Sequence, residues 1–239
     1  MRLIVLNSNS KGNGYILDSD KGSLLLEAGF CSRVINPFAR ATHPVFGCVV
    51  SHHHSDHATY ARAFARRCLL RGTDDLNDVA PEAMPMKEGK TYTFGDFRVS
   101  PFNVPHYNAD ESICQNFGYL IRHPEMGTLL FATDTFTLPY RFPNVNHFLI
   151  ECNYQDEILN EQVENGETTF SQKKRIQISH MSLKGCIAAI RQCGTEHCRT
   201  ITLCHISSRH ANPEEMVHAV QSEFGIPTYI ATKLAKIEL

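Results

Sequence analysis

The sequence predicts an α/β fold in which two mixed β-sheets are covered by helices. Short apolar or alternating runs, which are typical of strands, dominate both halves of the 239 residues. Helical patterns recur in two places, after a histidine cluster that begins at residue 52 and after Glu151. Helices placed in this way fit two covered sheets better than one doubly wound sheet. At roughly one domain per ~150 residues, we expect a single domain over residues 1–239.

The first part of the chain reads as strands, one helix and a further strand. Residues 3–6, 15–18 and 23–27 are short apolar or alternating runs, and the polar, Gly-containing segments between them predict hairpin turns. Residues 32–42 carry apolar side chains at helical spacing, which predicts a helix. The apolar run 46–50 predicts a buried strand that leads directly into the segment SHHHSDH.

The rest of the chain predicts two hairpins followed by alternating strands and helices. The hairpins are expected over 91–104 and 117–134, where alternating runs flank short turn segments. Residues 165–179 are the most loop-like segment, and we predict a loop there. The remaining helices are expected at 58–67, 154–164, 182–193 and 213–224, and the remaining strands at 68–71, 147–152, 199–204, 227–230 and 235–238.

The composition excludes several classes of protein. A hydrophobic content of 42% is close to that of soluble globular proteins and rules out disordered and fibrous chains. The net charge of −2 means that an anionic partner must be attracted locally. No apolar run approaches the ~18 residues of a membrane-spanning helix, and the N-terminus lacks a secretory pattern. We therefore expect a cytoplasmic protein without membrane contact, in which the nine Cys residues are reduced.

A metal site is indicated by the histidine cluster. His52, His54 and Asp56 have a period of two, so their side chains project the same way from an extended segment, and His57 follows directly. His53 is out of phase and is expected to point away. Imidazole and carboxylate are ligands that Zn²⁺ prefers, and they also suit Mn²⁺. Four such groups exceed what one open tetrahedral ion needs, which suggests two ions that share ligands, although a chance cluster on a solvated loop is the alternative.

Further motifs along the chain carry a resemblance to a known family. The segment Ser8–Gly14 resembles a serine-, glycine- and asparagine-rich opening loop, and LLLEAG resembles an LLIDxG strand. SHHHSDH resembles a metal motif, and it is followed in order by VPH at 104–106, ATD at 132–134 and LCH at 203–205. Over nearly its whole length, the chain is similar to the metallo-β-lactamase superfamily, in particular to its ribonuclease Z-like and small bacterial or phage exonuclease-like phosphodiesterases.

The resemblance implies a fold and a set of ligands. The fold would be a four-layer αββα sandwich. One ion would be held by His52, His54 and His106, and the other by Asp56, His57 and His205, with Asp134 between them. Two Zn²⁺ ions are expected, with Mn²⁺ as the alternative, and they would activate a bridging hydroxide as the nucleophile. The residues agree in kind, because His106, Asp134 and His205 each end an apolar strand, although loops also carry such side chains for other reasons.

Protonation of the leaving group is assigned to His180, again by resemblance. His180 precedes an amphipathic helix and resembles a histidine-serine helix start of the family, while Glu151 resembles the glutamate that orients that histidine. We expect His180 to act as general acid or phosphate ligand, positioned by Glu151, so that both join Asp56 as catalytic residues. The alternative for His180 is an ordinary residue at a helix start.

Four residues near these motifs are predicted to contact the substrate. Ser207 and Asn212 follow the last ligand motif, and Arg62 and Lys174 belong to basic segments that flank the predicted site. Each has a structural alternative: Asn212 before Pro213 fits a helix cap, and the basic segments fit solvated surfaces. Two departures from the family pattern, Glu27 in place of Asp and Tyr107 where Asp often follows the histidine, leave the predicted ligands unchanged.

The function predicted from these features is a dinuclear metal-dependent phosphodiesterase that acts on nucleic acid, either DNA or RNA, as an exonuclease. The alternative is hydrolysis of a small molecule on the same fold, such as a cyclic or small phosphodiester, a lactone or a thioester, because the ligands do not distinguish these substrates. A non-catalytic metal-binding module is disfavoured because no ligand is missing.

Overall fold

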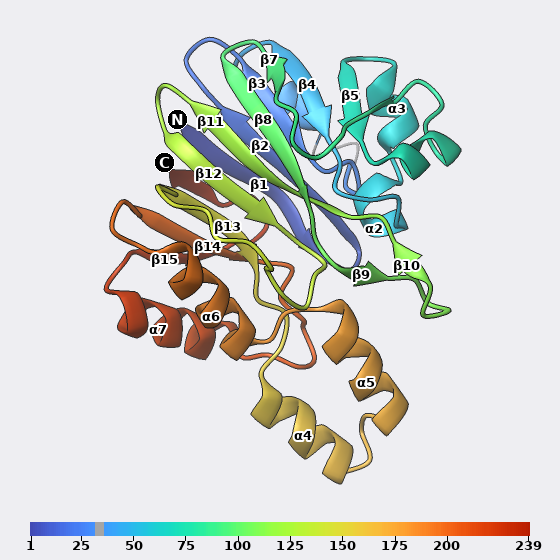
Figure 1. Cartoon of the computed structure of the whole chain (residues 1–239), viewed down its shortest axis with the longest axis vertical. Coiled ribbons are helices and arrows are strands. Elements are labelled where there is room, and N and C mark those ends of the chain that lie inside the picture. The colour runs from blue at the N-terminus through green and yellow to red at the C-terminus, as the bar shows by residue number, and fades with distance from the viewer. Residues whose placement is uncertain (32–35) are drawn as a thin grey trace.

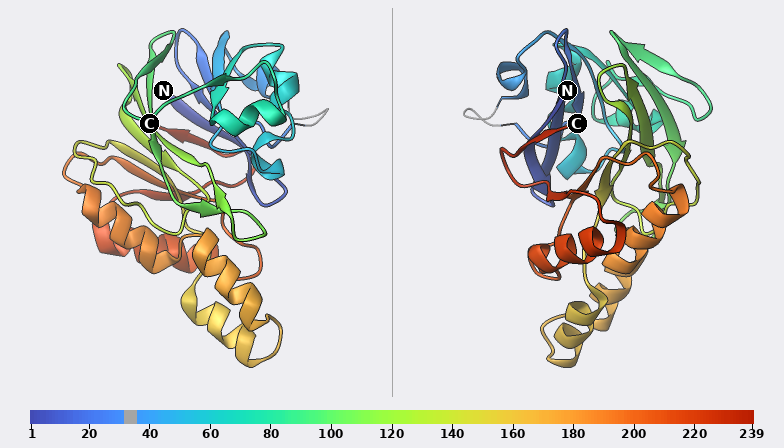
Figure 2. Two further views of the ribbon diagram at one scale, coloured as in Figure 1. Left: turned by 45° about the vertical axis from the view of Figure 1, so that its right-hand side comes forward. Right: turned by 90° about the vertical axis from the view of Figure 1, so that its left-hand side faces the viewer.

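Two seven-stranded sheets lie face to face in the computed structural model, which describes residues 1–31 and 36–239. Figure 2 shows the blue strands of the first sheet opposite the green and yellow strands of the second. The first sheet has the order β16-β1-β2-β3-β4-β5-β6 and the second the order β15-β14-β13-β12-β11-β8-β7. Both sheets contain parallel and antiparallel pairs, which confirms the predicted mixed sheets.

The strands follow the apolar runs of the sequence closely. In the first sheet they are β1 (Arg2–Asn9), β2 (Gly12–Asp18), β3 (Ser23–Leu26), β4 (Val45–Val49), β5 (Leu69–Gly72), β6 (Met84–Pro85) and β16 (Lys236–Glu238). In the second sheet they are β7 (Tyr92–Phe94), β8 (Phe97–Asn103), β11 (Phe117–His123), β12 (Gly127–Ala132), β13 (His147–Glu151), β14 (Thr200–Cys204) and β15 (Thr228–Ile230). The short pair β9 (His106–Tyr107) and β10 (Ile113–Cys114) forms a separate small sheet.

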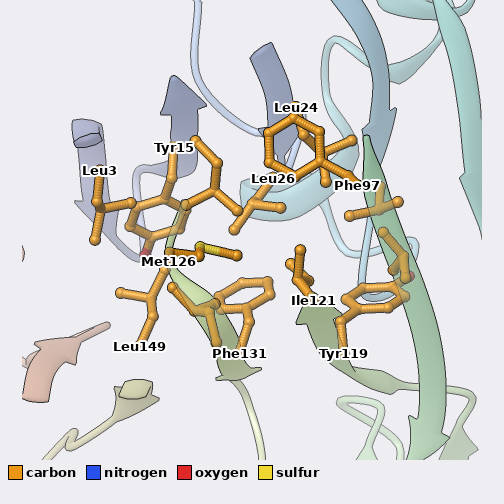
Figure 3. Packing of buried hydrophobic residues seen from close by; sticks show 14 of the residues in the cluster. Leu3, Tyr15, Leu24, Leu26, Phe97, Tyr119, Ile121, Met126, Phe131 and Leu149 are labelled. Carbon is orange, nitrogen blue, oxygen red and sulfur yellow. The ribbon is translucent and has the colours of Figure 1, made fainter. Parts of the chain in front are cut away.

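The main core fills the space between the two sheets. Side chains alternate along each strand, so Leu24 and Leu26 of β3 enter this core while Leu25 faces the outside of its sheet. Figure 3 shows Leu24 and Leu26 of the first sheet opposite Ile121 and Phe131 of the second. Burial of both faces explains why these strands read as continuous apolar runs rather than as alternating ones.

Helices cover the outer face of each sheet and complete four layers (Figure 1). On the first sheet, α2 (Ser55–Ala58) and α3 (Ala61–Ala65) contribute Ala58, Ala61 and Phe64 to an outer apolar cluster. On the second, α6 (Leu183–Cys193) and α7 (Pro213–Phe224) pack residues such as Ile190 and Val220 against β13 and β14. The predicted helix-covered sheets are therefore confirmed.

The prediction of a loop over 165–179 is wrong. Residues Phe170–Ser179 form α5, which pairs with α4 (Asp156–Glu164) in a helical hairpin that projects from the body of the molecule (Figure 1). The segment lacks an amphipathic stripe, but Thr169 and Gln172 form a capping box that satisfies the first amides of the helix. That Thr-x-x-Gln spacing is the sequence signal that would have revealed α5.

Two other helix predictions change in extent. Of the helix expected over 32–42, residues 32–35 lie outside the described residues, and the described part forms only α1 (Pro37–Arg40), which Asn36 caps. The helix expected over 58–67 is divided into α2 and α3, with Tyr60 outside both at the start of α3. A short 3-10 helix, Asp74–Asp78, was not anticipated. Among the described residues, no helix combines the length and hydrophobicity needed to cross a membrane.

Candidate metal centre

The predicted ligand residues come together at one end of the sandwich. Asp134 follows β12 and His205 follows β14, and because β12, β13 and β14 run parallel, their carboxyl ends reach the same edge. The histidine cluster reaches this edge from the other sheet, with His52 and His54 between β4 and α2 and with Asp56 and His57 in α2. Within each of two groups, the ligand-type atoms lie within 4.8 Å of one another: His52, His54 and His106 in the first, and Asp56, His57, Asp134 and His205 in the second.

The first group consists of three imidazoles. Nδ1 of His54 lies 3.1 Å from Nε2 of His106, and Nε2 of His52 lies 4.0 Å from Oδ2 of Asp134. That buried Nε2 has no hydrogen-bond partner among the described residues. An unpaired buried nitrogen is costly unless something binds it. Three imidazoles around a carboxylate oxygen are a donor set that fits Zn²⁺.

The second group has the spacing of a tetrahedral metal site. Nε2 of His57 lies 3.3 Å from Oδ2 of Asp56 and 3.2 Å from Oδ1 of Asp134. Nε2 of His205 also lies 3.3 Å from Oδ2 of Asp56. Ligand atoms that each lie 2.0–2.1 Å from a tetrahedral zinc are about 3.3 Å apart, so these atoms fit such an ion. Asp134 turns Oδ2 toward the first group and Oδ1 toward the second.

The backbone at two of these residues is strained. Asp134 and His205 adopt φ angles of 51° and 52°, in the left-handed region that L-residues rarely occupy. Asn116 donates from Nδ2 to the carbonyl of Asp134 at 2.8 Å, and Asn153 donates to the carbonyl of His205 at 2.7 Å. These two asparagines, which no sequence motif marks, hold the turns that aim both side chains into the centre.

The other ring nitrogen of His52, His54 and His205 is contacted by a neighbouring group. Such contacts select the tautomer that leaves the first nitrogen available to a metal. Ser51 Oγ lies 2.9 Å from Nδ1 of His52, Asn108 Oδ1 lies 2.9 Å from Nε2 of His54, and Glu151 Oε1 lies 3.1 Å from Nδ1 of His205.

Glu27, the first departure from the family pattern, serves His57 in the same way. Its carboxylate is 1% exposed and accepts the backbone N–H of Ser51 at 3.2 Å. Its Oε2 lies 3.4 Å from Nδ1 of His57. The longer Glu side chain therefore reaches both the strand end and a ring of the second group.

The electrostatics of the two groups differ. Burial lowers the pKa of His52 well below its usual value and that of His106 to about 4, so both are neutral near pH 7. Burial also lowers the pKa of His205, but the carboxylates of Asp134 and Glu151 outweigh it and raise the pKa to about 10. Burial raises the pKa of Asp134, but the neighbouring imidazoles lower it well below its usual value. Asp134 is therefore ionised, and the second group attracts positive charge.

His180 lies beside the second group at the end of α5. Its Nδ1 donates to Oε1 of Glu151 at 2.7 Å, and its side chain is 23% exposed. Glu151 is fully buried, and its Oε2 accepts the backbone N–H of Thr135 at 2.8 Å. One fixed carboxylate therefore orients both His180 and His205.

Two adjoining pockets open onto this centre. The first, of 280 Å³, is lined by ligand residues together with Tyr107, Arg175 and His180. The second, of 370 Å³, shares His180 and His205 with it and extends past Lys11 and Ser207. Basic and hydroxyl side chains thus line the approach to the centre.

The four residues that were predicted to contact the substrate lie at different distances from the centre, and only one of them lines a pocket there. Ser207 lines the second pocket. Asn212 caps α7 by accepting the backbone N–H of Glu215. It therefore has the helix-capping role that was the alternative to substrate contact. Lys174 lies 3.4 Å from Glu111 on the surface, and Arg62 lies in α3 and lines neither pocket. Arg175, which the sequence analysis did not select, lines the first pocket.

His53 turns away from the two groups, as its phase predicts. Its Nδ1 lies 2.8 Å from Oδ2 of Asp75 rather than beside the ligand atoms of His52 and Asp56.

Comparisons with known proteins identify a family for the chain. A beta-lactamase superfamily domain matches residues 24–206. The chain is 28% identical to the exodeoxyribonuclease WalJ of Streptococcus pneumoniae, over 90% of this chain and 84% of the relative.

Solved structures share the fold at lower identity. The metallo-beta-lactamase fold protein YhfI from Bacillus subtilis has a TM-score of 0.75 at 15% identity over 99% of both chains. Zn²⁺-bound PqqB from Methylobacterium extorquens has a TM-score of 0.70 at 15% identity over 100% of both. The family match covers well over half of the chain, and the predicted fold class is confirmed. The chain therefore belongs to the beta-lactamase superfamily, as a hydrolase with the metallo-β-lactamase fold.

Proposed function

We propose that the protein is a dinuclear metal-dependent exonuclease that hydrolyses the terminal phosphodiester bonds of DNA. The observation that carries the proposal is the position of Asp134, whose two carboxylate oxygens face two separate donor groups. In this proposal His52, His54 and His106 hold one divalent ion, and Asp56, His57 and His205 hold the other. Zn²⁺ suits both donor sets, and Mn²⁺ is the alternative.

Two divalent ions in such a site supply a hydroxide nucleophile near neutral pH and positive charge for the transition state. The protein's own residues do the rest. Asp134 and Asp56 bring negative charge to the centre, and their low pKa values keep them ionised at physiological pH. The buried carboxylates of Glu27 and Glu151 hold His57 and His205 in place from behind.

The leaving group takes its proton from His180 in this mechanism. An alkoxide leaves slowly unless it is protonated as the bond breaks. His180 lines both pockets at the centre, and its Nδ1 is held by Glu151, which leaves Nε2 to donate toward a bound substrate. Glu151 touches no substrate and acts as a positioning residue.

Nucleic acid is favoured as substrate by the relative and by the pockets. The pneumococcal relative is named an exodeoxyribonuclease, and the match spans most of both chains. Lys11 and Arg209 line the second pocket and Arg175 the first, where they would meet the phosphates of a strand.

The test is cleavage of end-labelled single-stranded and duplex DNA and RNA by Zn²⁺- and Mn²⁺-loaded protein, beside Asp134→Asn. Asn tolerates the left-handed backbone of residue 134, so this variant removes the shared carboxylate without adding strain. The proposal expects two ions per chain by mass spectrometry and stepwise shortening of DNA that the variant loses. If the DNA strands remain intact although two ions are bound, the proposal is wrong, and a small phosphodiester or ester substrate is favoured.

A further inference from the structure

A third cleft adjoins the metal centre on the side opposite the basic pocket. Its volume is 650 Å³, within the ~300–1,000 Å³ of small-ligand sites. It shares His106 and Tyr107 with the first pocket, so the two adjoin at these residues. Its other lining residues include Val104, Ile113 and Tyr140. Neither the ligand groups nor His180 explain why so much apolar surface lies beside a charged centre.

Two side chains of this cleft are held on one face of the small sheet. Ile113 of β10 lies directly opposite Tyr107 of β9 in an antiparallel pair, so both side chains project to the same side. Ile113 is 82% exposed, which is unusual for a large apolar residue. The ring of Tyr107 is stacked on Phe136, with centroids 6.4 Å apart and planes inclined by 20°. Tyr107 and Phe136 therefore form an aromatic surface at this position.

No Lys, Arg, Asp or Glu is among the described residues that line this cleft, whereas Lys11 and Arg209 line the pocket that extends past Ser207. The hydroxyl of Tyr140 donates a hydrogen bond to Oε1 of Glu88 at 2.8 Å, which places a carboxylate beside the cleft. A phosphate would be repelled there, whereas Lys11 and Arg209 attract phosphates on the opposite side.

We propose that this cleft binds one unpaired nucleobase of the strand being hydrolysed, next to the phosphodiester at the metal centre. A base is flat and neutral, and it stacks on aromatic rings whatever its sequence. The amide side chains of Asn103 and Gln115, which also line the cleft, suit the polar edge of a base. The substrate is then a single-stranded or frayed end, because a paired base cannot leave its stack without cost. This inference rests on the proposed nuclease function.

The test compares two strands that differ only at the terminal nucleotide, which carries adenine in one and is abasic in the other. Metal-loaded wild-type protein is assayed beside Tyr107→Ala, Ile113→Ala and the matched control Tyr229→Ala, an exposed tyrosine on β15 away from the centre. We expect wild type and the control to favour the adenine strand in kcat/KM by about tenfold. The two cleft variants should lose most of that ratio.

A binding measurement separates this proposal from the nuclease function. The terminal base is replaced by 2-aminopurine in a strand with phosphorothioate linkages, which slow hydrolysis. Its fluorescence should fall on binding to wild type and to Tyr229→Ala, and much less on binding to Tyr107→Ala.

Each outcome is decisive for the cleft. Equal cleavage of the two strands by wild type would overturn the cleft while leaving the nuclease function intact. No cleavage of either strand would reject the nuclease function itself, and with it the cleft as a substrate site. If Ile113→Ala instead converts a dimer to a monomer in sedimentation and keeps the base preference, the exposed surface is a contact between two copies and the proposal is wrong.

Discussion

Oε2 of Glu27 lies 3.4 Å from Nδ1 of His57, with both side chains fully buried. Glu27 directly follows β3, and its φ angle is 65°. No other described group bonds Nδ1 of His57. Glu27 is therefore the carboxylate that contacts the side of the ring facing away from the metal group.

Replacing that carboxylate should weaken metal binding without unfolding the protein. In Glu27→Gln the side chain keeps its size but loses a charge that, after that of Asp134, raises the pKa of His57. Loss of such a partner typically lowers metal affinity about 10–100-fold. Competition with a fluorescent chelator measures this directly, and circular dichroism controls for folding. Unchanged affinity for both ions would show that Glu27 is only structural.

Removal of metal should lower the thermal stability of wild type more than that of Asp134→Asn. An ion that binds only the folded state stabilises it by about 2.7 kcal/mol at a free concentration 100 times Kd. We expect the Tm of wild type to fall on chelation and to recover with Zn²⁺. A variant that lacks the shared carboxylate should have a nearly constant Tm in calorimetry. Equal shifts in both proteins would contradict a role for Asp134 in holding metal.

Loss of His180 should matter only when the leaving group is poor. General acid catalysis contributes about 10²–10⁴-fold, so His180→Ala should lose that factor in kcat on a DNA strand. On an aryl phosphodiester, whose phenolate leaves unaided, the loss should be small. Glu151→Gln should instead lower the rate on both substrates, because Glu151 holds the proposed ligand His205 as well as His180. For His180→Ala, equal losses on both substrates would indicate instead that His180 binds phosphate or metal.

Arg175 and Lys174 are neighbours on α5 and offer a matched pair. Arg175 lines the metal pocket, whereas Lys174 lies beside Glu111 on the surface. One phosphate contact on a single strand contributes about 0.7 to the slope of log K against log salt concentration. Arg175→Ala should lower the slope by that amount and weaken DNA binding, and Lys174→Ala should change it less. Fluorescence anisotropy over a salt series gives both slopes.

A separate prediction concerns acid stability and Asp18, which is remote from the centre. Burial raises the pKa of Asp18, but bonds from Ser23 and Thr42 and the charge of Arg2 outweigh it, so the pKa is lowered. A lowered folded-state pKa contributes stability above the unfolded value, and that contribution is lost as pH falls through the folded value. Asp18→Asn should therefore lower the free energy of unfolding at about pH 7, measured by urea titration, by on the order of 1–3 kcal/mol. The difference in the free energy of unfolding between wild type and Asp18→Asn should decrease toward about pH 3. A difference that does not change with pH would contradict this assignment.

Much of the fold followed from the sequence because local pattern and tertiary burial agree. Leu24 to Leu26 read as a strand because both faces of that strand are buried. The ligand-type residues could be named because their order and spacing are themselves the signal. Where stability comes from a few contacts, pattern failed: α5 has no apolar stripe and depends on its cap. The roles of Asn116 and Asn153 could not be predicted from the sequence, because they arise only when distant segments of the chain meet.

The proposed ligands come from both sheets of the sandwich. The cluster from His52 to His57 follows a strand of the first sheet, whereas Asp134 and His205 follow strands of the second. Ions shared between them would act as a cross-link between the two sheets, closing a loop of chain that spans most of the molecule. The layers could not part without first releasing the ions. Resistance to proteases that attack transiently opened chains would then report how well the cell supplies this protein with metal.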